Sequence, residues 1–237
     1  MNWVVFDTEA TNCPMVDGKL DVKNGQVYDL GAWVINDAGE KLDHISLING
    51  DVFFRMPDAM REAYYAEKIP QYMKDIWDGK RTVVNTWGMW KAFAELCKKW
   101  DVVGAVAHNA HFDRTVLNAT IRYQTKSKKR YFLPFNLPLV DSLKIAQNTI
   151  CKSADYIAFC EANGYMTNHA TPRPRATAEV LWKYLTQNND FVEEHTGLSD
   201  AEIEATIFLK CHQYGVENCP NFLPAKNRAV AYSHCAA

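Results

Sequence analysis

Two carboxylates close to the N-terminus could hold a metal ion together. Asp7 and Glu9 follow the apolar run WVVF, which is typical of a short buried strand. Side chains two residues apart on a strand point to the same face, so these two acids would repel each other unless a cation lay between them. Oxygen ligands of this kind suit Mg²⁺ or Mn²⁺. Taken alone, the pair is more often a solvated strand end, because acidic residues are common.

A third acid lies where another buried strand passes into a helix, in the segment VAHNAHFDRTVL. Asn109 can cap this helix, and Asp113 stands one step round from the apolar stripe of Phe112, Val116 and Ala119. The helix dipole favours an acid in the first turn without any further role. The run HNAHFD is less ordinary than a lone aspartate, and it places Asp113 near the end of the sheet.

A histidine and a fourth acid occur together in the segment EEHTGLSDAEIEATIFLKC. Ser199 and Glu202 form a capping box, which predicts a helix that begins near Asp200. His195 lies in the preceding loop, five residues before Asp200, so both side chains could face one site. A histidine beside a metal cluster is suited to take a proton from water, although a surface histidine beside acids fits the same pattern.

Residues 122–135, RYQTKSKKRYFLPF, interleave basic and aromatic side chains. Basic groups can contact phosphates and aromatic rings can stack on unpaired bases, which makes this segment a candidate for substrate binding. A solvated loop after a helix explains the pattern as well. The basic candidates are Lys126, Lys128, Lys129 and Arg130, interspersed with Tyr123, Tyr131 and Phe132.

A sheet and several helices must bring these candidates together. Apolar and alternating runs predict strands at 3–6, 27–35, 41–48 and 102–108, the first three as an antiparallel meander. Helical patterns or strand-to-helix transitions follow at 86–100, from 109 onward, and at 137–146, 153–163, 175–187 and 199–213. Strands followed by alternating helices and strands predict an α/β fold, with a mixed central sheet flanked by helices.

The composition limits the class of protein. The 237 residues are 48% hydrophobic and 23% charged, which fits one domain, with or without an insertion, and excludes collagen, coiled coil and wholesale disorder. We find no membrane-length apolar run and no signal or transit peptide. Seven widely spaced cysteines indicate a reducing compartment, so we expect a cytoplasmic protein. A net charge of −2 disfavours a protein that coats nucleic acid, but not an enzyme that holds a few nucleotides through metal ions.

In their order and spacing, the three acidic segments resemble the three motifs of the DEDDh-type 3′–5′ exonucleases, which are DnaQ-like members of the ribonuclease H-like superfamily. The resemblance covers roughly residues 3 to 213. The matching segments are FDTEATN with Asp7 and Glu9, HNAHFD with Asn109, Phe112 and Asp113, and HTGLSDA with His195 and Asp200.

The chain also departs from the family pattern. Ala10, Thr11 and Asn12 stand where the family often has Thr-Thr-Gly, and Gly197 stands where the third motif usually has alanine. A second histidine, His169, also precedes a helical pattern. The residue five positions after His169 is a proline and not an acid, so we assign the third motif to His195 and Asp200.

The resemblance implies a ribonuclease H-like fold and two Mg²⁺ or Mn²⁺ ions held by Asp7, Glu9, Asp113 and Asp200. One ion would activate a water whose proton His195 removes, and the other would stabilise the leaving 3′ oxygen. The resemblance also implies that Ala10 and Thr11 contact substrate through main-chain groups, and that Asn109 and Phe112 lie at the substrate.

The implied activity is release of nucleoside monophosphates from the 3′ end of nucleic acid, with single-stranded DNA as the expected substrate. An exoribonuclease of the same fold is an alternative, because the chemistry is shared. A catalytically weak polymerase-accessory or binding module is another, although the complete set of acids and the histidine argue against it. We expect an exonuclease domain over residues 1–214 and a tail over 215–237, with no membrane contact.

Overall fold

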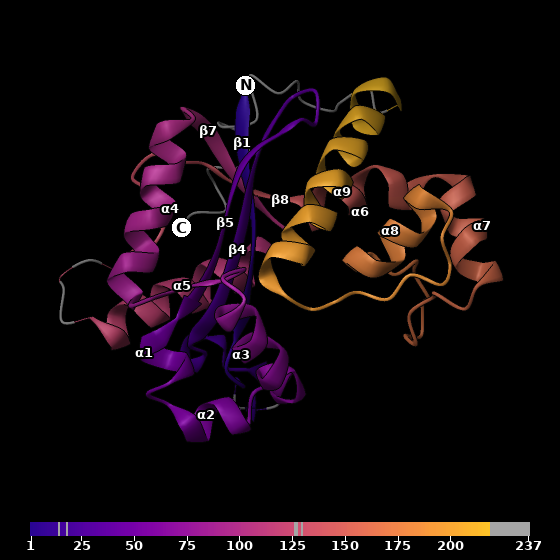
Figure 1. Ribbon diagram of the computed structural model, residues 1–237. Coiled ribbons are helices and arrows are strands. Elements are labelled where there is room, and N and C mark those ends of the chain that lie inside the picture. The colour runs from indigo at the N-terminus through magenta and orange to yellow at the C-terminus, as the bar shows by residue number, and fades with distance from the viewer. Residues whose placement is uncertain (14, 18, 126–127, 129, 219–237) are drawn as a thin grey trace.

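The computed structural model describes residues 1–13, 15–17, 19–125, 128 and 130–218 (Figure 1). Within these residues a six-stranded mixed sheet has the strand order β6-β5-β4-β1-β7-β8 and carries helices on both faces. The predicted α/β class is therefore confirmed. The strands of the sheet are β1 (Asn2–Ala10), β4 (Val27–Asn36), β5 (Lys41–Asn49), β6 (Thr82–Val84), β7 (Val102–Ala107) and β8 (Leu139–Asp141).

The strand directions bring the predicted motifs to one edge of the sheet. Strands β1, β4 and β5 form the predicted antiparallel meander, whereas β7 runs parallel to β1 and β8 runs parallel to β7. The carboxyl ends of β1, β7 and β8 therefore meet at the same edge. Ligands of open α/β sheets bind outside such carboxyl ends.

The alternation of side chains along β1 divides the core into two layers. Val4 and Phe6 pack into the cluster that includes α4 (Thr86–Lys99) and α5 (Ala110–Gln124). Trp3 and Val5 pack on the opposite face. The helices of that face are α6 (Ser142–Asn148), α7 (Ala154–Ala162), α8 (Ala178–Thr186) and α9 (Gly197–Asn218), with the 3₁₀ turn η3 (Ile150–Lys152).

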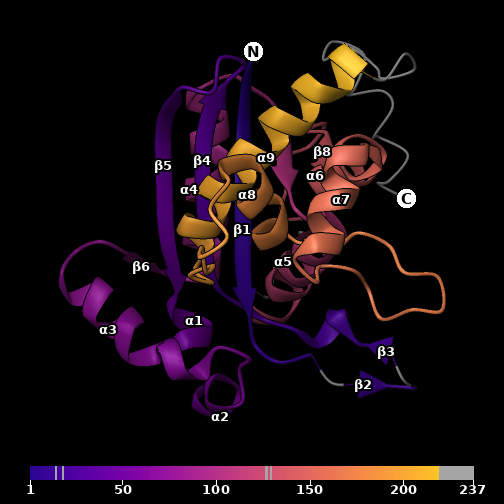
Figure 2. The same ribbon diagram turned by 90° about the vertical axis from the view of Figure 1, so that its right-hand side faces the viewer.

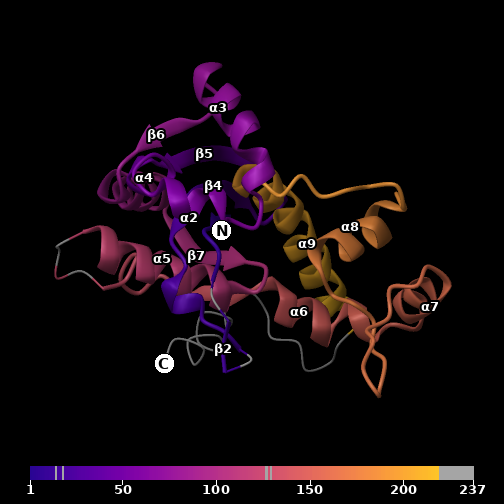
Figure 3. The same ribbon diagram turned by 90° about the horizontal axis from the view of Figure 1, so that it is seen from below.

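The segment between β5 and β6 forms a small helical group with its own core, in which Tyr28, Ile48, Phe53 and Tyr72 are buried. Figure 2 shows this group at the end of the sheet where β1 finishes, and Figure 3 looks onto that end from below. The group consists of α1 (Gly50–Phe53), α2 (Pro57–Arg61), the 3₁₀ turn η2 (Ala66–Lys68) and α3 (Ile69–Trp77). After β1 come the short strands β2 (Met15–Val16) and β3 (Lys19–Leu20) and the turn η1 (Val22–Asn24).

The predicted capping box at the start of the last helix is wrong. Helix α9 begins at Gly197, and the backbone N–H of Asp200 already donates to the carbonyl oxygen of Thr196. Glu202 pairs instead with Lys41 of β5, so its side chain does not fold back onto the helix start. Asp200 nevertheless lies in the first turn of α9, as expected.

Helix α9 continues to Asn218, beyond the predicted helix end at 213 and beyond the expected domain boundary at 214. The rest of the expected tail, from residue 219, lies outside the described residues. None of the helices in the described part of the chain is both long and apolar enough to cross a membrane.

Candidate active site

A cavity of about 650 Å³ lies at the edge of the sheet where β1 and β7 end. Its walls come from the end of β1, the first turns of α5 and α9, and the segment that joins α2 to η2. The residues predicted for catalysis all line this one cavity: Asp7, Glu9, Asp113, His195 and Asp200.

Three of the four predicted metal ligands lie close enough together to share a metal ion. Single oxygen atoms of Asp7, Glu9 and Asp200 all lie within 4.8 Å of one another. Asp7 and Glu9 have the same orientation on β1, because residues two apart on a strand share a face. Asp200 reaches them from the first turn of α9. These carboxylates come from opposite ends of the chain, and only the packing of α9 on the sheet brings them together.

A glycine pair permits this close packing. A β-carbon on Gly31 of β4 would lie only 2.0 Å from the backbone nitrogen of Leu198, and one on Gly197 would lie 2.6 Å from the nitrogen of Gly31. Asp29 of β4 also accepts a hydrogen bond from the N–H of Gly197 at 2.9 Å. Gly197, which departs from the alanine of the family pattern, is therefore required where α9 begins against β4.

Asp113 approaches from the other face of β1. Thr8 points toward α5, and its hydroxyl donates to Asp113 Oδ1 at 2.8 Å. Asn109, the residue directly before α5, has the left-handed backbone conformation, with φ 69° and ψ 45°, which asparagine tolerates better than most residues. Asn109 occupies the N-cap position of α5, as predicted, but its side chain makes no cap hydrogen bond. Its backbone N–H donates to Asp141 Oδ1 at 3.2 Å.

Burial disfavours ionisation of the acids in the cavity, and for most of them the charges of neighbouring carboxylates add to this effect. Burial raises the pKa of Asp7 well above its ordinary value, and the neighbouring carboxylates, Glu204 foremost, raise it further. Burial and then Asp200 raise the pKa of Glu9 to about 9. Burial is also the main cause that raises the pKa of Asp113 to about 7 and that of Asp200 to about 8. A bound cation would reverse these shifts, because it favours the charged form of each acid.

The ligand set fits a divalent cation. Asp200 Oδ1 is buried and accepts no hydrogen bond from the described residues, although such oxygens in proteins are nearly always satisfied. A metal ion would satisfy it. The donors are carboxylate oxygens, which are the ligands preferred by Mg²⁺ and Mn²⁺.

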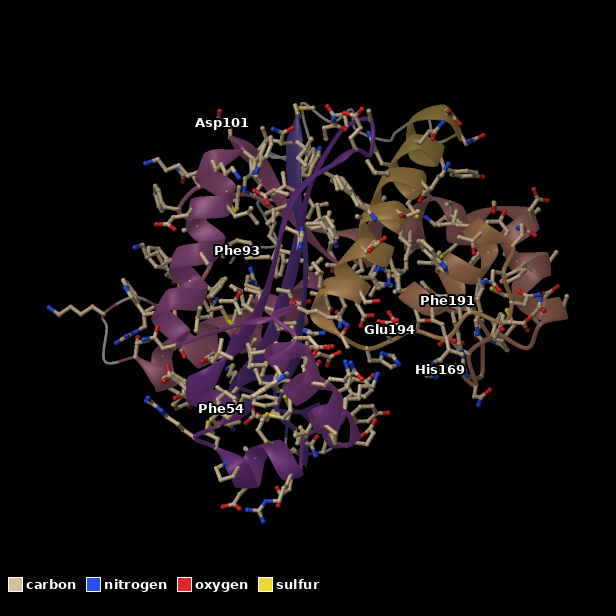
Figure 4. All side chains as sticks on the ribbon, viewed as in Figure 1. Phe54, Phe93, Asp101, His169, Phe191 and Glu194 are labelled. Carbon is tan, nitrogen blue, oxygen red and sulfur yellow. The ribbon has the colours of Figure 1, made fainter. Side chains whose placement is uncertain are left out.

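His195 lies in the loop before α9, as predicted. One of its ring nitrogens lies within 4.8 Å of oxygen atoms of both Glu193 and Asp200. Burial, followed by the charge of Lys68, lowers the pKa of the imidazole, so it is neutral near pH 7 and able to accept a proton. The alternative histidine, His169, is exposed on the loop that hangs below α7 and α8 in Figure 4, and it does not line the cavity.

Sequence reasoning missed several residues of this cavity. Glu204 is buried one helical turn after Asp200 and accepts a hydrogen bond from the N–H of His108 at 3.0 Å. Its spacing of four residues from Asp200 is a signal that could have identified it. Glu193 lies beside His195, and burial raises its pKa to about 7. Tyr64 and Tyr65 carried no comparable signal, because only the tertiary fold brings them to the cavity.

The predicted substrate contacts divide into two groups. Ala10, Thr11, Asn109 and Phe112 all line the cavity. The N–H of Thr11, however, already donates to the carbonyl oxygen of Gln26 at 2.9 Å, so this group is occupied within the protein.

The basic segment lies elsewhere. Lys128 and Arg130 are exposed and follow the last turn of α5, whereas Asp113 lies in its first turn, roughly 16 Å of helix away. Phe132 is only 2% exposed and packs on Phe93, so it is not available to stack on a base. Lys126 and Lys129 lie outside the described residues.

Comparisons with known proteins support the fold. The sequence matches no family model and no curated protein sequence. Among solved structures, the chain is similar to the nuclease domain of 3′hExo, a DEDDh family member, bound to rAMP, with a TM-score of 0.54, 13% identity, and coverage of 92% of this chain and 93% of that one.

Two further structures agree. A full-length 3′-exonuclease gives a TM-score of 0.59 and 15% identity over 90% of this chain and 82% of its own. Exonuclease I of E. coli, in complex with a dT13 oligonucleotide, gives a TM-score of 0.52 and 10% sequence identity. The match covers 91% of this chain and 42% of that one. The chain therefore has the fold of the DEDDh exonuclease nuclease domains, as the resemblance of its three acidic segments implies.

Proposed function

We propose that the protein is a metal-dependent 3′–5′ exonuclease that releases nucleoside monophosphates from single-stranded DNA. One observation carries this proposal: carboxylate oxygens of Asp7, Glu9 and Asp200 lie within 4.8 Å of one another, in a cavity that also contains Asp113 and His195. A cluster of buried acids with a histidine at its rim suits phosphodiester hydrolysis.

The chain's own residues supply the ligands and the base. Asp7, Glu9, Asp113 and Asp200 would hold two Mg²⁺ or Mn²⁺ ions, and Thr8 fixes the carboxylate of Asp113. Bound ions of this kind activate water and stabilise the leaving oxygen. His195 is the general base, because it lies at the cluster and burial keeps its imidazole neutral.

Several features support a nucleic-acid end as the substrate. The structural relatives include one bound to rAMP and one bound to a dT13 oligonucleotide. Besides the acids, Tyr64, Tyr65 and residues 176–178 line the cavity, and we expect a site lined in this way to suit an unpaired end better than a continuous duplex. The rAMP complex is the observation that favours RNA as the alternative substrate.

The test compares DNA and RNA oligonucleotides of one sequence, labelled at the 5′ end, with and without Mg²⁺ or Mn²⁺. We expect stepwise shortening from the 3′ end that requires the metal and is faster on DNA. Asp7→Asn should abolish activity while the circular dichroism spectrum stays unchanged, because removal of one charge from a repelling cluster relieves strain in the free protein.

Asp155→Asn is the matched control, because Asp155 is an exposed acid on α7 that does not line the cavity. It should retain full activity. A wild-type protein that shortens neither oligonucleotide, or an Asp7→Asn variant with a normal rate at saturating Mg²⁺, would contradict the proposal. Faster shortening of RNA would correct the substrate and leave the reaction class in place.

A further inference from the structure

The loop that carries His195 is held against the small helical group, which lies more than a hundred residues earlier in the chain. The imidazole of His195 stacks on the ring of Tyr65, with ring centres 4.5 Å apart and planes inclined by 15°. The ammonium group of Lys68 donates to the carbonyl oxygen of Glu194, the residue directly before His195. Two separate contacts therefore join this loop to residues 65–68.

His195 needs such support, because none of the described residues holds its side chain by a hydrogen bond. It lies outside any helix or strand, and its φ of 51° falls in the left-handed region that non-glycine residues rarely occupy. Its side chain is 33% exposed, and the nearest acidic oxygen to Nδ1, Glu193 Oε2, is 3.8 Å away. That distance is too long for a hydrogen bond. Among the described residues, the ring contact that holds this imidazole is the face of Tyr65.

Tyr65, in contrast, is held in place by several contacts of its backbone and its ring. Two hydrogen bonds close the turn that carries it. The N–H of Ala66 donates to the carbonyl oxygen of Ala63, and the N–H of Lys68 donates to the carbonyl oxygen of Tyr65. Ala63 belongs to the buried core of the helical group. The ring of Tyr65 also has Tyr64 edge-on at 4.8 Å and the ammonium of Lys68 at 5.3 Å. A fixed ring thus meets a weakly held imidazole.

We propose that Tyr65 is a positioning residue for His195. The flat face of its ring holds the imidazole in the orientation that brings a ring nitrogen close to Asp200. Lys68 fixes the backbone at Glu194, directly before His195. The inference rests on the proposed function, in which His195 is the general base. A base displaced by about 1 Å can transfer protons about a hundredfold more slowly, so the stacked ring should contribute to the chemical rate and not to binding of substrate.

The kinetic test compares Tyr65→Leu, which removes the ring, with Tyr65→Phe, which keeps it. We expect Tyr65→Leu to lower the single-turnover rate by about ten- to a hundredfold, part of the contribution of a general base, with the Michaelis constant changed by less than about twofold. Tyr65→Phe should restore the wild-type rate, because stacking needs the ring and not the hydroxyl. Combined with His195→Ala, Tyr65→Leu should cause no further loss.

Trp77→Leu is the matched control for loss of an aromatic ring from the same helical group. Trp77 is 90% exposed at the end of α3 and does not line the cavity, so its removal should leave the rate unchanged. A structural readout that is independent of activity is the proton NMR spectrum of the imidazole. The ring current of Tyr65 should shift the resonances of the His195 ring protons. Tyr65→Leu should therefore change their chemical shifts, whereas Tyr65→Phe should leave them as in the wild type.

The outcomes separate this inference from the proposed function. If His195→Ala is slow while Tyr65→Leu has a normal rate, Tyr65 does not position the base. A rise in the Michaelis constant that persists in the His195→Ala background would also overturn the inference, because it would mean that Tyr65 contacts substrate instead. If His195→Ala itself is fully active, the base assignment within the proposed function fails, and the positioning role fails with it.

Discussion

At the scale of single residues, the choice between two histidines decides how the site is assigned. His195 lies at the acid cluster, whereas His169 is exposed and does not line the cavity. We therefore expect His195→Ala to slow the chemical step by roughly a hundredfold or more, the usual size of a lost acid–base group. Metal affinity should remain almost intact, because the four carboxylates are still present. His169→Ala should be close to wild type in both respects.

The pH dependence of the rate tests the same residue. Protonated His195 cannot accept a proton, so the wild-type rate should fall as the pH drops through the pKa of the imidazole. Burial and the charge of Lys68 place that pKa below the ordinary value of 6.5. His195→Ala should lack this acidic limb. A rate profile of His195→Ala that still falls in the same range would assign the limb to another group.

At the scale of elements, the position of Asp200 depends on how the start of α9 is anchored. The buried carboxylate of Asp29 accepts hydrogen bonds from Gly197, from the hydroxyl of Tyr72 at 2.9 Å and from Arg81 Nη1 at 2.8 and 2.9 Å. Burial raises the pKa of Asp29, and Arg81 opposes that rise. One carboxylate thus joins β4, α3 and α9, directly beside the strand position of Glu9.

Arg81→Met should therefore cost about 3 kcal/mol of unfolding free energy, because it leaves a buried carboxylate without its charge partner. It should also lower activity, since the first turn of α9 loses its fixed anchor. Urea unfolding measures the first effect. Arg61→Met removes an exposed pair with Asp58 and should cost no more than about 1 kcal/mol. Equal losses for the two variants would show that the Asp29 network does not anchor the helix.

The elements that the sequence predicted well are those whose signal is local. Buried strands such as β1 and β7 are apolar runs, and Asp7 and Glu9 follow from strand periodicity alone. The capping box failed because Glu202 finds Lys41 on a distant strand. The stacking of Tyr65 on His195 joins residues 130 positions apart and leaves no local pattern. Contacts of this kind are decided by packing, which periodicity does not reveal.

At the scale of the whole molecule, a chain with little net charge gathers a cluster of acidic residues in one cavity. The net charge is only −2, yet six carboxyl groups line this site. Without bound cations, the acidic cavity would therefore repel the phosphates of nucleic acid. Bound cations would reverse the sign of the local electrostatic potential. The six groups are those of Asp7, Glu9, Asp113, Glu193, Asp200 and Glu204.

This arrangement predicts how stability depends on pH and metal. The pKa values of Asp113, Asp200 and Glu9 are raised to about 7, 8 and 9 in the folded protein, so the folded state binds more protons than the unfolded state above the ordinary carboxyl range. The stability that these groups contribute is complete below their ordinary pKa values of about 4, and it is lost as the pH rises from there to the raised values of the folded protein. With a chelator present, the unfolding free energy should therefore fall from about pH 4 to about pH 9.

Saturating Mg²⁺ or Mn²⁺ should flatten or reverse that fall, because the ion binds only the folded, deprotonated cluster. Urea unfolding at a series of pH values, with chelator or with metal, measures both effects. Asp7→Asn is expected to weaken the stabilisation by metal and to reduce the slope in chelator, since it removes one of the repelling charges. Asp155→Asn should change neither. If the chelator profile of the wild type is flat and metal leaves it unmoved, the carboxylates do not form one electrostatically coupled cation site.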